Sequence, residues 1–106
     1  MAARAPKHLS EAARKIWNSV VKDYELEPRH LELLRLALEA LDAAEKARQT
    51  IASEGQIVDG GRYGKKAHPC IAIERDSRIA HARLMRELGL DLENPAASRP
   101  PSRWRA

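Results

Sequence analysis

The chain has one cysteine, no phenylalanine and no long run of apolar residues. A disulfide within the chain needs two cysteines, so Cys70 cannot form one, and we expect a reducing compartment, the cytoplasm. A transmembrane helix needs about 18 or more consecutive apolar residues. No such run occurs and no apolar signal-peptide region is found near the first residue, so the sequence predicts that the chain does not span a membrane.

The sequence also lacks the motifs of metal, nucleotide and nucleophile sites. Neither Cys-x-x-Cys nor His-Glu-x-x-His occurs among its one cysteine and four histidines. Gly64-Lys65-Lys66 is only faintly similar to a P-loop, because that motif needs Gly where Asp59 stands and Ser or Thr where Lys66 stands. No serine or histidine lies in a nucleophile signature. We therefore predict no catalytic residue, no metal, no cofactor and no enzymatic activity.

Aromatic residues make up 4% of the chain, whereas hydrophobic residues make up 43%. The core must therefore be built from Leu, Ile, Val and Ala, which favours a globular all-α protein over a disordered one. A chain of 106 residues forms one small domain at most. Because so small a core supports only modest stability, self-association would help to stabilise it.

Charge is distributed unevenly along the chain. Residues 1–22 contain five bases and one acid, residues 23–59 four bases and nine acids, and residues 60–106 ten bases and five acids. Basic regions on both sides of an acidic middle suggest that the two ends of the chain meet an anionic partner. The simpler interpretation is that these charges belong to ordinary solvated helix faces.

The first predicted helix covers residues 11–24. Ser10 is a favoured N-cap residue, and apolar side chains follow it at helical spacing, namely Ala13, Ile16, Trp17, Val20, Val21 and Tyr24. Trp17 is interpreted as a core anchor rather than as a platform that stacks on a base. The preceding residues 1–9 contain two bases and Pro6 and are predicted to form a flexible basic arm.

A second, long helix is predicted from about Pro28 to Ser53, closed by Gly55. Between residues 31 and 41 only three residues are polar, in one narrow stripe, so leucines cover most of the circumference. A helix that is apolar nearly all round is buried on more than one side, and one chain of three helices can hardly cover it. We therefore predict an oligomer interface at Leu34, Ala37, Leu38, Leu41 and Ala44. The alternative is a single, very apolar core helix.

A glycine-rich basic segment separates this helix from a third one. Gln56-Ile57-Val58 is a possible extended segment, and the following glycines predict a turn, so a two-stranded hairpin is possible. The third helix is predicted to begin at His68-Pro69 and to end at Gly89. Its apolar face consists of Ile73, Ala80, Leu84 and Leu88, with Met85 beside them, and its outer side carries Arg75, Arg78, Arg83 and Arg86. Residues 91–106 contain three prolines and are predicted to form a disordered basic tail.

The order of several short segments resembles the small subunits of phage terminases. Leu9-Ser10-Glu11-Ala12-Ala13, then Ile16-Trp17, then a long helix that ends at Glu54-Gly55, resemble the amino half of that family. Three later segments of this chain resemble the carboxyl half of the family, namely Lys66-Ala67-His68-Pro69, then Ile73 and Arg75, and then Arg86-Glu87-Leu88-Gly89-Leu90. The resemblance implies an oligomerising helical core over residues 10–90. Its fold would be a helical hairpin with a long central helix, a Gly-rich loop and a third helix.

The resemblance implies a regulator of DNA packaging and not a motor. Small terminase subunits assemble into rings, bind viral double-stranded DNA, and recruit or stimulate the large terminase subunit, which holds the ATPase and the nuclease. The host cytoplasm is the implied location. Two alternatives stay open, a small helical DNA-binding transcription regulator and a helical adaptor that binds only protein. The regulator would need a compact, turn-linked pair of helices, which helices of about 26 and 20 residues separated by a Gly-rich loop do not fit well.

Basic residues supply the candidate contacts with DNA. Arg62, Lys65 and Lys66 lie in a glycine-rich loop whose backbone can approach phosphate closely, and the third helix adds Arg75 and Arg78. If the loop only solubilises the surface, the contact would lie at Arg4, Lys7, Arg14 and Lys15, or in the tail. Trp and Arg are frequent anchors in protein interfaces. The tail therefore offers a candidate docking site for the large terminase subunit at Arg103, Trp104 and Arg105, unless these arginines only add to the attraction for DNA.

Overall fold

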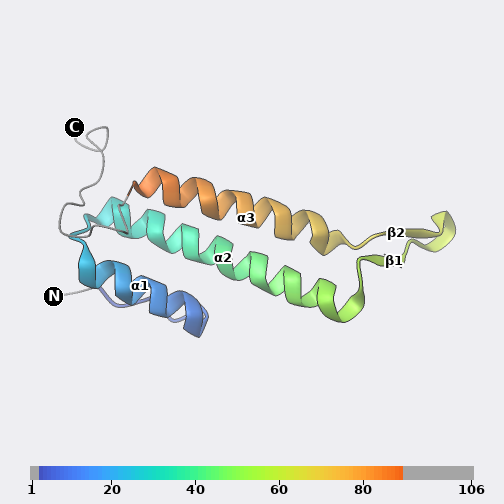
Figure 1. The fold of residues 1–106 in the computed structure, drawn as a ribbon, viewed down its shortest axis with the longest axis horizontal. Helices are drawn as coiled ribbons and strands as arrows, with labels where there is room; N and C mark the ends of the chain where they lie inside the picture. The colour runs from blue at the N-terminus through green and yellow to red at the C-terminus, as the bar shows by residue number, and fades with distance from the viewer. Residues whose placement is uncertain (1–2, 90–106) are drawn as a thin grey trace.

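A computed structural model describes residues 3–89 of the chain, without the side chain of Tyr63. Its elements are helix α1 (Glu11–Asp23), helix α2 (Pro28–Glu54), strand β1 (Ile57–Asp59), the short helix η1 (Gly61–Tyr63), strand β2 (Lys65–Ala67) and helix α3 (Pro69–Leu88). Helix α2 lies between α1 and α3, and the two strands project from the far end of the α2–α3 pair (Figure 1). The described residues therefore form the predicted all-α fold with one small two-stranded sheet.

The helices begin and end where the sequence supplies caps. The Ser10 hydroxyl accepts a hydrogen bond of 3.1 Å from the backbone N–H three residues later, at the start of α1. Pro28 occupies the first turn of α2, and Gly55, with a φ of 87°, ends that helix. His68 caps the start of α3, and Gly89 ends it in the left-handed region. The predicted helix boundaries are confirmed to within one residue.

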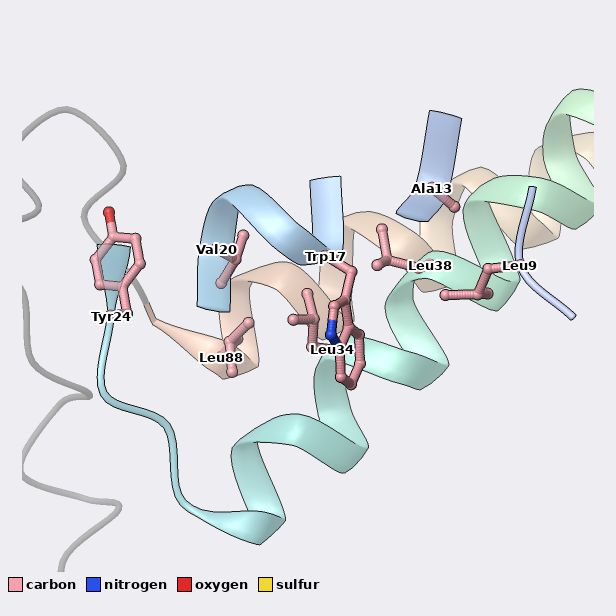
Figure 2. Close-up of a cluster of buried hydrophobic side chains, with 8 residues drawn as sticks. All are labelled: Leu9, Ala13, Trp17, Val20, Tyr24, Leu34, Leu38 and Leu88. Atoms are coloured by element: carbon pink, nitrogen blue, oxygen red, sulfur yellow. The ribbon is translucent and has the colours of Figure 1, made fainter. Parts of the chain in front are cut away.

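The core lies where α1, the first half of α2 and the end of α3 meet (Figure 2). Its buried apolar members are Leu9, Ala13, Trp17, Val20, Tyr24, Leu34, Leu38 and Leu88. Trp17 is 4% exposed, and its indole N–H donates a hydrogen bond of 3.0 Å to the carbonyl of Ala3. The interpretation of Trp17 as a core anchor is therefore confirmed.

This core corrects the assignment of the predicted interface residues to a subunit contact. Leu34, Ala37 and Leu38 are completely buried, and Ala44 is 8% exposed. Leu41 is half-buried and packs against the same cluster. Helices α1 and α3 cover different sides of α2, so one chain provides the cover that the sequence pattern assigned to a second copy. Self-association stays a prediction. In this fold Leu34, Ala37 and Leu38 are not accessible to a second copy, whereas the half-buried Leu41 stays a predicted contact.

The predicted flexible arm is corrected over residues 3–9, because this N-terminal segment packs on the helices. Leu9 is 3% exposed and belongs to the core. His8 Nε2 lies 2.7 Å from Glu39 Oε2, and the backbone N–H and hydroxyl of Ser10 donate to the Asp42 carboxylate over 2.8 and 2.5 Å. The segment is ordered because its apolar residues join the core while its polar groups bind carboxylates of α2.

Toward the strands, the side chains between α2 and α3 become smaller and more of them are polar. Leu88 is fully buried at the core end, and the His81 ring lies 2.7 Å from a backbone carbonyl of α2. Further along α2 the buried residues are Ala44 and Ala47. Ile73, predicted on the apolar face of α3, is 49% exposed. The half-buried residues at this end of α3 are Cys70, Ile71, Glu74 and Ser77.

Candidate nucleic-acid interface

The predicted basic loop is a β-hairpin. Strands β1 and β2 pair in antiparallel register, with Ile57 opposite Ala67, Val58 opposite Lys66 and Asp59 opposite Lys65. The hairpin extends beyond the ends of both long helices (Figure 1). The sequence allowed this hairpin as a possibility, and the strand pairing confirms it.

The turn of the hairpin depends on its glycines. The Gly60 N–H donates to the carbonyl of Gly64 over 2.5 Å, and the Gly64 N–H donates to the carbonyl of Gly61 over 3.0 Å. Gly61 and Gly64 have φ values of +67° and +80°, a region that other residues rarely adopt. A Cβ atom at Gly60 would collide with the carbonyl oxygen of Gly64. Asp59 Oδ1 accepts a further hydrogen bond of 2.8 Å from the Gly61 N–H. The sequence therefore specifies this turn closely.

Three basic residues surround this turn. Arg62 lies at the tip and Lys65 and Lys66 on β2, and all three are exposed. None of them makes an ion pair within the described part of the chain. Successive residues of a strand point to opposite faces, so Lys65 and Lys66 extend from opposite faces of the ribbon. The hairpin thus carries a lysine on each face and an arginine at its tip, and Asp59, opposite Lys65 in the register, shares the Lys65 face.

His68 holds the base of the hairpin. Its side chain is 8% exposed, and Nδ1 accepts a hydrogen bond of 3.0 Å from the Cys70 N–H, which caps α3. Because Nδ1 is an acceptor, Nε2 carries the proton and donates to Glu54 Oε1 over 2.9 Å, at the end of α2. The backbone N–H of His68 also donates to the Gln56 carbonyl over 2.8 Å. One residue therefore joins the end of α2, the start of β1 and the start of α3.

Sequence reasoning identified His68 as a helix-start residue but missed Glu54 and Gln56 as its partners. No local signal marks such a contact, because Glu54 and His68 are 14 residues apart. The strand pairing between them, together with the packing of α2 against α3, brings the two residues together.

The two predicted contacts of α3 lie on the helix and not on the hairpin itself. The side chains of Arg75 and Arg78 are 57% and 67% exposed on the helix. Arg75 pairs with Asp76 over 3.3 Å, and Arg78 pairs with Glu74 over 3.7 Å. These acidic neighbours reduce the positive charge that either arginine offers to phosphate.

The alternative basic residues lie away from the hairpin, in α1 and the N-terminal segment, which contact the middle of α2. Arg14 and Lys15 are exposed on α1, and Arg4 and Lys7 are exposed in the N-terminal segment. The proposed tail residues Arg103, Trp104 and Arg105 lie outside the described residues.

Residues 3–89 contain no group of three or more potential metal ligands. No helix within that range is both long and apolar enough to cross a membrane.

One comparison with known proteins gives a match. A family model described as phage terminase, small subunit, matches residues 13–101. No curated protein and no solved structure matches the chain. The matched range includes most of α1, all of α2 and α3, and the whole β-hairpin.

Proposed function

Because this chain belongs to the family of phage terminase small subunits, we propose that it binds double-stranded viral DNA through its β-hairpin and recruits or regulates the large terminase subunit. The family gives the chain a role in phage DNA packaging, and its members are generally not catalytic. Packaging takes place in the host cytoplasm, where we place this protein.

The observation that carries the DNA contact is the shape and charge of the hairpin. The major groove of B-DNA admits a two-stranded β-ribbon, and phosphate backbones border the groove on both sides. A ribbon with Lys65 on one face, Lys66 on the other and Arg62 at its tip can reach both borders. Contacts of this kind are largely independent of base sequence and weaken as salt rises. His68 fixes the base of the ribbon, so less ordering is needed on binding.

Replacing Arg62, Lys65 and Lys66 together by Ala tests this contact. We expect lower affinity for every duplex sequence and a salt dependence reduced by up to about three charges. Fluorescence anisotropy with labelled duplexes at several salt concentrations measures both quantities. The matched control replaces Arg14, Lys15 and Lys22 of α1 by Ala, which removes the same number of charges.

The opposite outcome would place the DNA contact elsewhere. If the hairpin variant binds like the wild type while the α1 variant loses affinity, the contact lies at α1 and the N-terminal segment. If the wild type binds no duplex even at low salt, the protein acts as an adaptor that binds only protein.

For the large subunit, we also propose docking at Arg103, Trp104 and Arg105. A tryptophan between two arginines has the composition of an interface anchor. Deleting residues 97–106 should preserve DNA binding and self-association but abolish stimulation of the large-subunit ATPase. Full stimulation by the shortened chain would move the docking site to the helices.

For self-association, we propose a homo-oligomer larger than a dimer, and a ring as its form. Joining several hairpins in one particle would multiply a weak affinity for DNA. Sedimentation velocity measures the assembly, and a monomer at tens of micromolar would contradict it.

A further inference from the structure

Among residues 3–89, no element covers one side of helix α3. Ile79 is 49% exposed and lies two residues before His81, whose ring contacts α2, so Ile79 is on the side of α3 away from α2. Ala72 and Arg83 lie seven residues before and four residues after Ile79, on the same side, and both are exposed. In Figure 1, α3 forms one edge of the molecule, and no other described element lies outside it. We call Ala72, Ile79 and Arg83 the α3 stripe.

A second uncovered stripe runs along α2. Leu36 is 38% exposed and is the one leucine between residues 31 and 41 that the core leaves exposed. Glu32 lies four residues before it and Ala43 seven residues after it, which places all three on one side of the helix. The Glu32 side chain is 59% exposed, and Ala43 is exposed as well. We call Glu32, Leu36 and Ala43 the α2 stripe.

The two stripes are complementary in size and charge. Each has one exposed aliphatic side chain, one alanine and one charged residue, and the two charges are opposite in sign. The same side of α3 also carries Arg86 and Arg75, and Asp76 offsets the charge of Arg75. Arg83 makes no ion pair within the described residues. Glu32 pairs with Arg35 through Oε1, and this hydrogen bond lowers the pKa of Glu32, so the carboxylate is ionised at neutral pH.

The spacing of the two stripes also matches. Within the chain, α3 runs antiparallel to α2 (Figure 1). If α3 of one copy lies antiparallel against α2 of another, aligning Ile79 with Leu36 places Arg83 opposite Glu32 and Ala72 opposite Ala43. The alanines allow the two helix backbones to approach closely at one end. At the other end Arg83 and Glu32 attract each other. Between the two ends, Ile79 and Leu36 bury apolar surface that is exposed to water in the single chain.

We propose that the α3 stripe of one copy of this chain binds the α2 stripe of a second copy. The two stripes are different surfaces of the same molecule, so each copy offers one surface to each of two neighbours. A contact of this type closes into a ring when the rotation between neighbours allows it, whereas a symmetric dimer would pair one surface with itself. This inference rests on the self-association proposed above and assigns the surfaces that form it.

Two substitutions test the assignment because they break opposite surfaces. Ile79→Glu puts a charge on the α3 stripe, and Leu36→Glu puts one on the α2 stripe. Both positions are partly exposed, so both variants should fold, which circular dichroism checks. We expect each variant alone to sediment as a monomer. The matched control is Ile57→Glu, at a hairpin position that is 64% exposed, and it should assemble like the wild type.

Mixing the two variants gives the sharper result. The Ile79→Glu chain keeps its α2 stripe and the Leu36→Glu chain keeps its α3 stripe, so one intact contact remains between them. We expect a dimer with one copy of each variant and no larger particle. Arg83→Glu should also weaken assembly, and adding Glu32→Arg to it should restore assembly.

Several results would overturn the assignment. A Leu36→Glu chain that forms a dimer by itself would show that the contact is symmetric. A mixture that stays monomeric, or either variant assembling like the wild type, would show that other surfaces are used while the proposed oligomer stands. A monomeric wild type would overturn the oligomer together with its surfaces. Duplex binding by the hairpin, measured on the same proteins, reports on the DNA contact independently.

Discussion

The two ends of the α2–α3 pair are stabilised by different forces. At the α1 end, Leu34, Leu38 and Leu88 are completely buried and Trp17 nearly so. At the strand end, every described side chain from residue 52 to residue 67 is exposed or half-buried, and His68 is the buried residue that connects the elements. Burial of apolar surface holds one end, and a few hydrogen bonds hold the other. Changes at the first end should therefore affect folding, whereas changes at the second should affect how the hairpin is presented.

The largest effect is expected from a cavity in the core. Leu38→Ala removes a completely buried side chain and should lower the free energy of unfolding by about 2–5 kcal/mol. Urea titration followed by circular dichroism measures this change. The matched control is Ile57→Ala at the strand end, which should change stability by less than about 0.5 kcal/mol. Equal losses in the two variants would mean that both ends depend on apolar burial.

An intermediate effect is expected at the base of the hairpin. His68→Ala removes the N-cap of α3 and the contact with Glu54, and should cost about 1 kcal/mol. Hydrogen exchange should become faster at the amides of β1 and β2 and stay unchanged in α1. His68→Asn keeps a capping side chain and should recover part of the stability. Uniformly faster exchange through all three helices would contradict the division into two ends.

The smallest effect is expected from protonation of His30 at the start of α2. His30 is 2% exposed, and its Nδ1 accepts a hydrogen bond of 3.1 Å from the backbone N–H of Glu27. Burial lowers the pKa of His30 below its ordinary value of 6.5, so the folded state favours the neutral ring. This contribution is fully present above pH 6.5 and is lost as the pH falls through the lowered pKa of the folded state.

Comparing the wild type with His30→Gln isolates this contribution from other acid-sensitive contacts. We expect the unfolding free energy of the wild type to fall more steeply than that of the variant between pH 7 and pH 5. Parallel pH profiles would show that His30 stays neutral in both the folded and the unfolded chain.

The helices could be predicted from the sequence because their caps act on adjacent backbone groups. Ser10 accepts a hydrogen bond from a backbone N–H three residues later, and Gly55 and Gly89 end the helices that directly precede them. Each effect is local, so local reasoning is sufficient. The partner that covers a helix is not a local property. The leucines of residues 31–41 give the same pattern whether their own chain or another chain covers them. For this reason the apolar pattern was identified correctly, but Leu34 and Leu38 were assigned to a contact between subunits, whereas they lie in the core of one chain.

The candidate site also has features that a short stretch of sequence shows and features that depend on contacts between distant residues. The glycines and the basic residues of the hairpin could be identified because turn chemistry and charge are visible in a short stretch of sequence. The placement of Lys65 and Lys66 on opposite faces needed the register of the strands. The packing of residues 3–9 depends on contacts such as that between Ala3 and Trp17, in which the backbone carbonyl of Ala3 is the acceptor. A carbonyl group is present in every residue, so the sequence could not single this one out.

Two contacts fix the position of α2 along the axis of α3. They restrict how insertions can lengthen these two helices. The His81 ring meets the carbonyl of Ala37, and Glu54 meets His68. Each added residue moves a helix end by about 1.5 Å, so an insertion in α2 alone would separate one of these pairs. Insertions should therefore occur in both helices together, and steps of about seven residues keep the same sides facing. Over evolutionary time, the reach of the hairpin from the core would change in steps of about 10 Å.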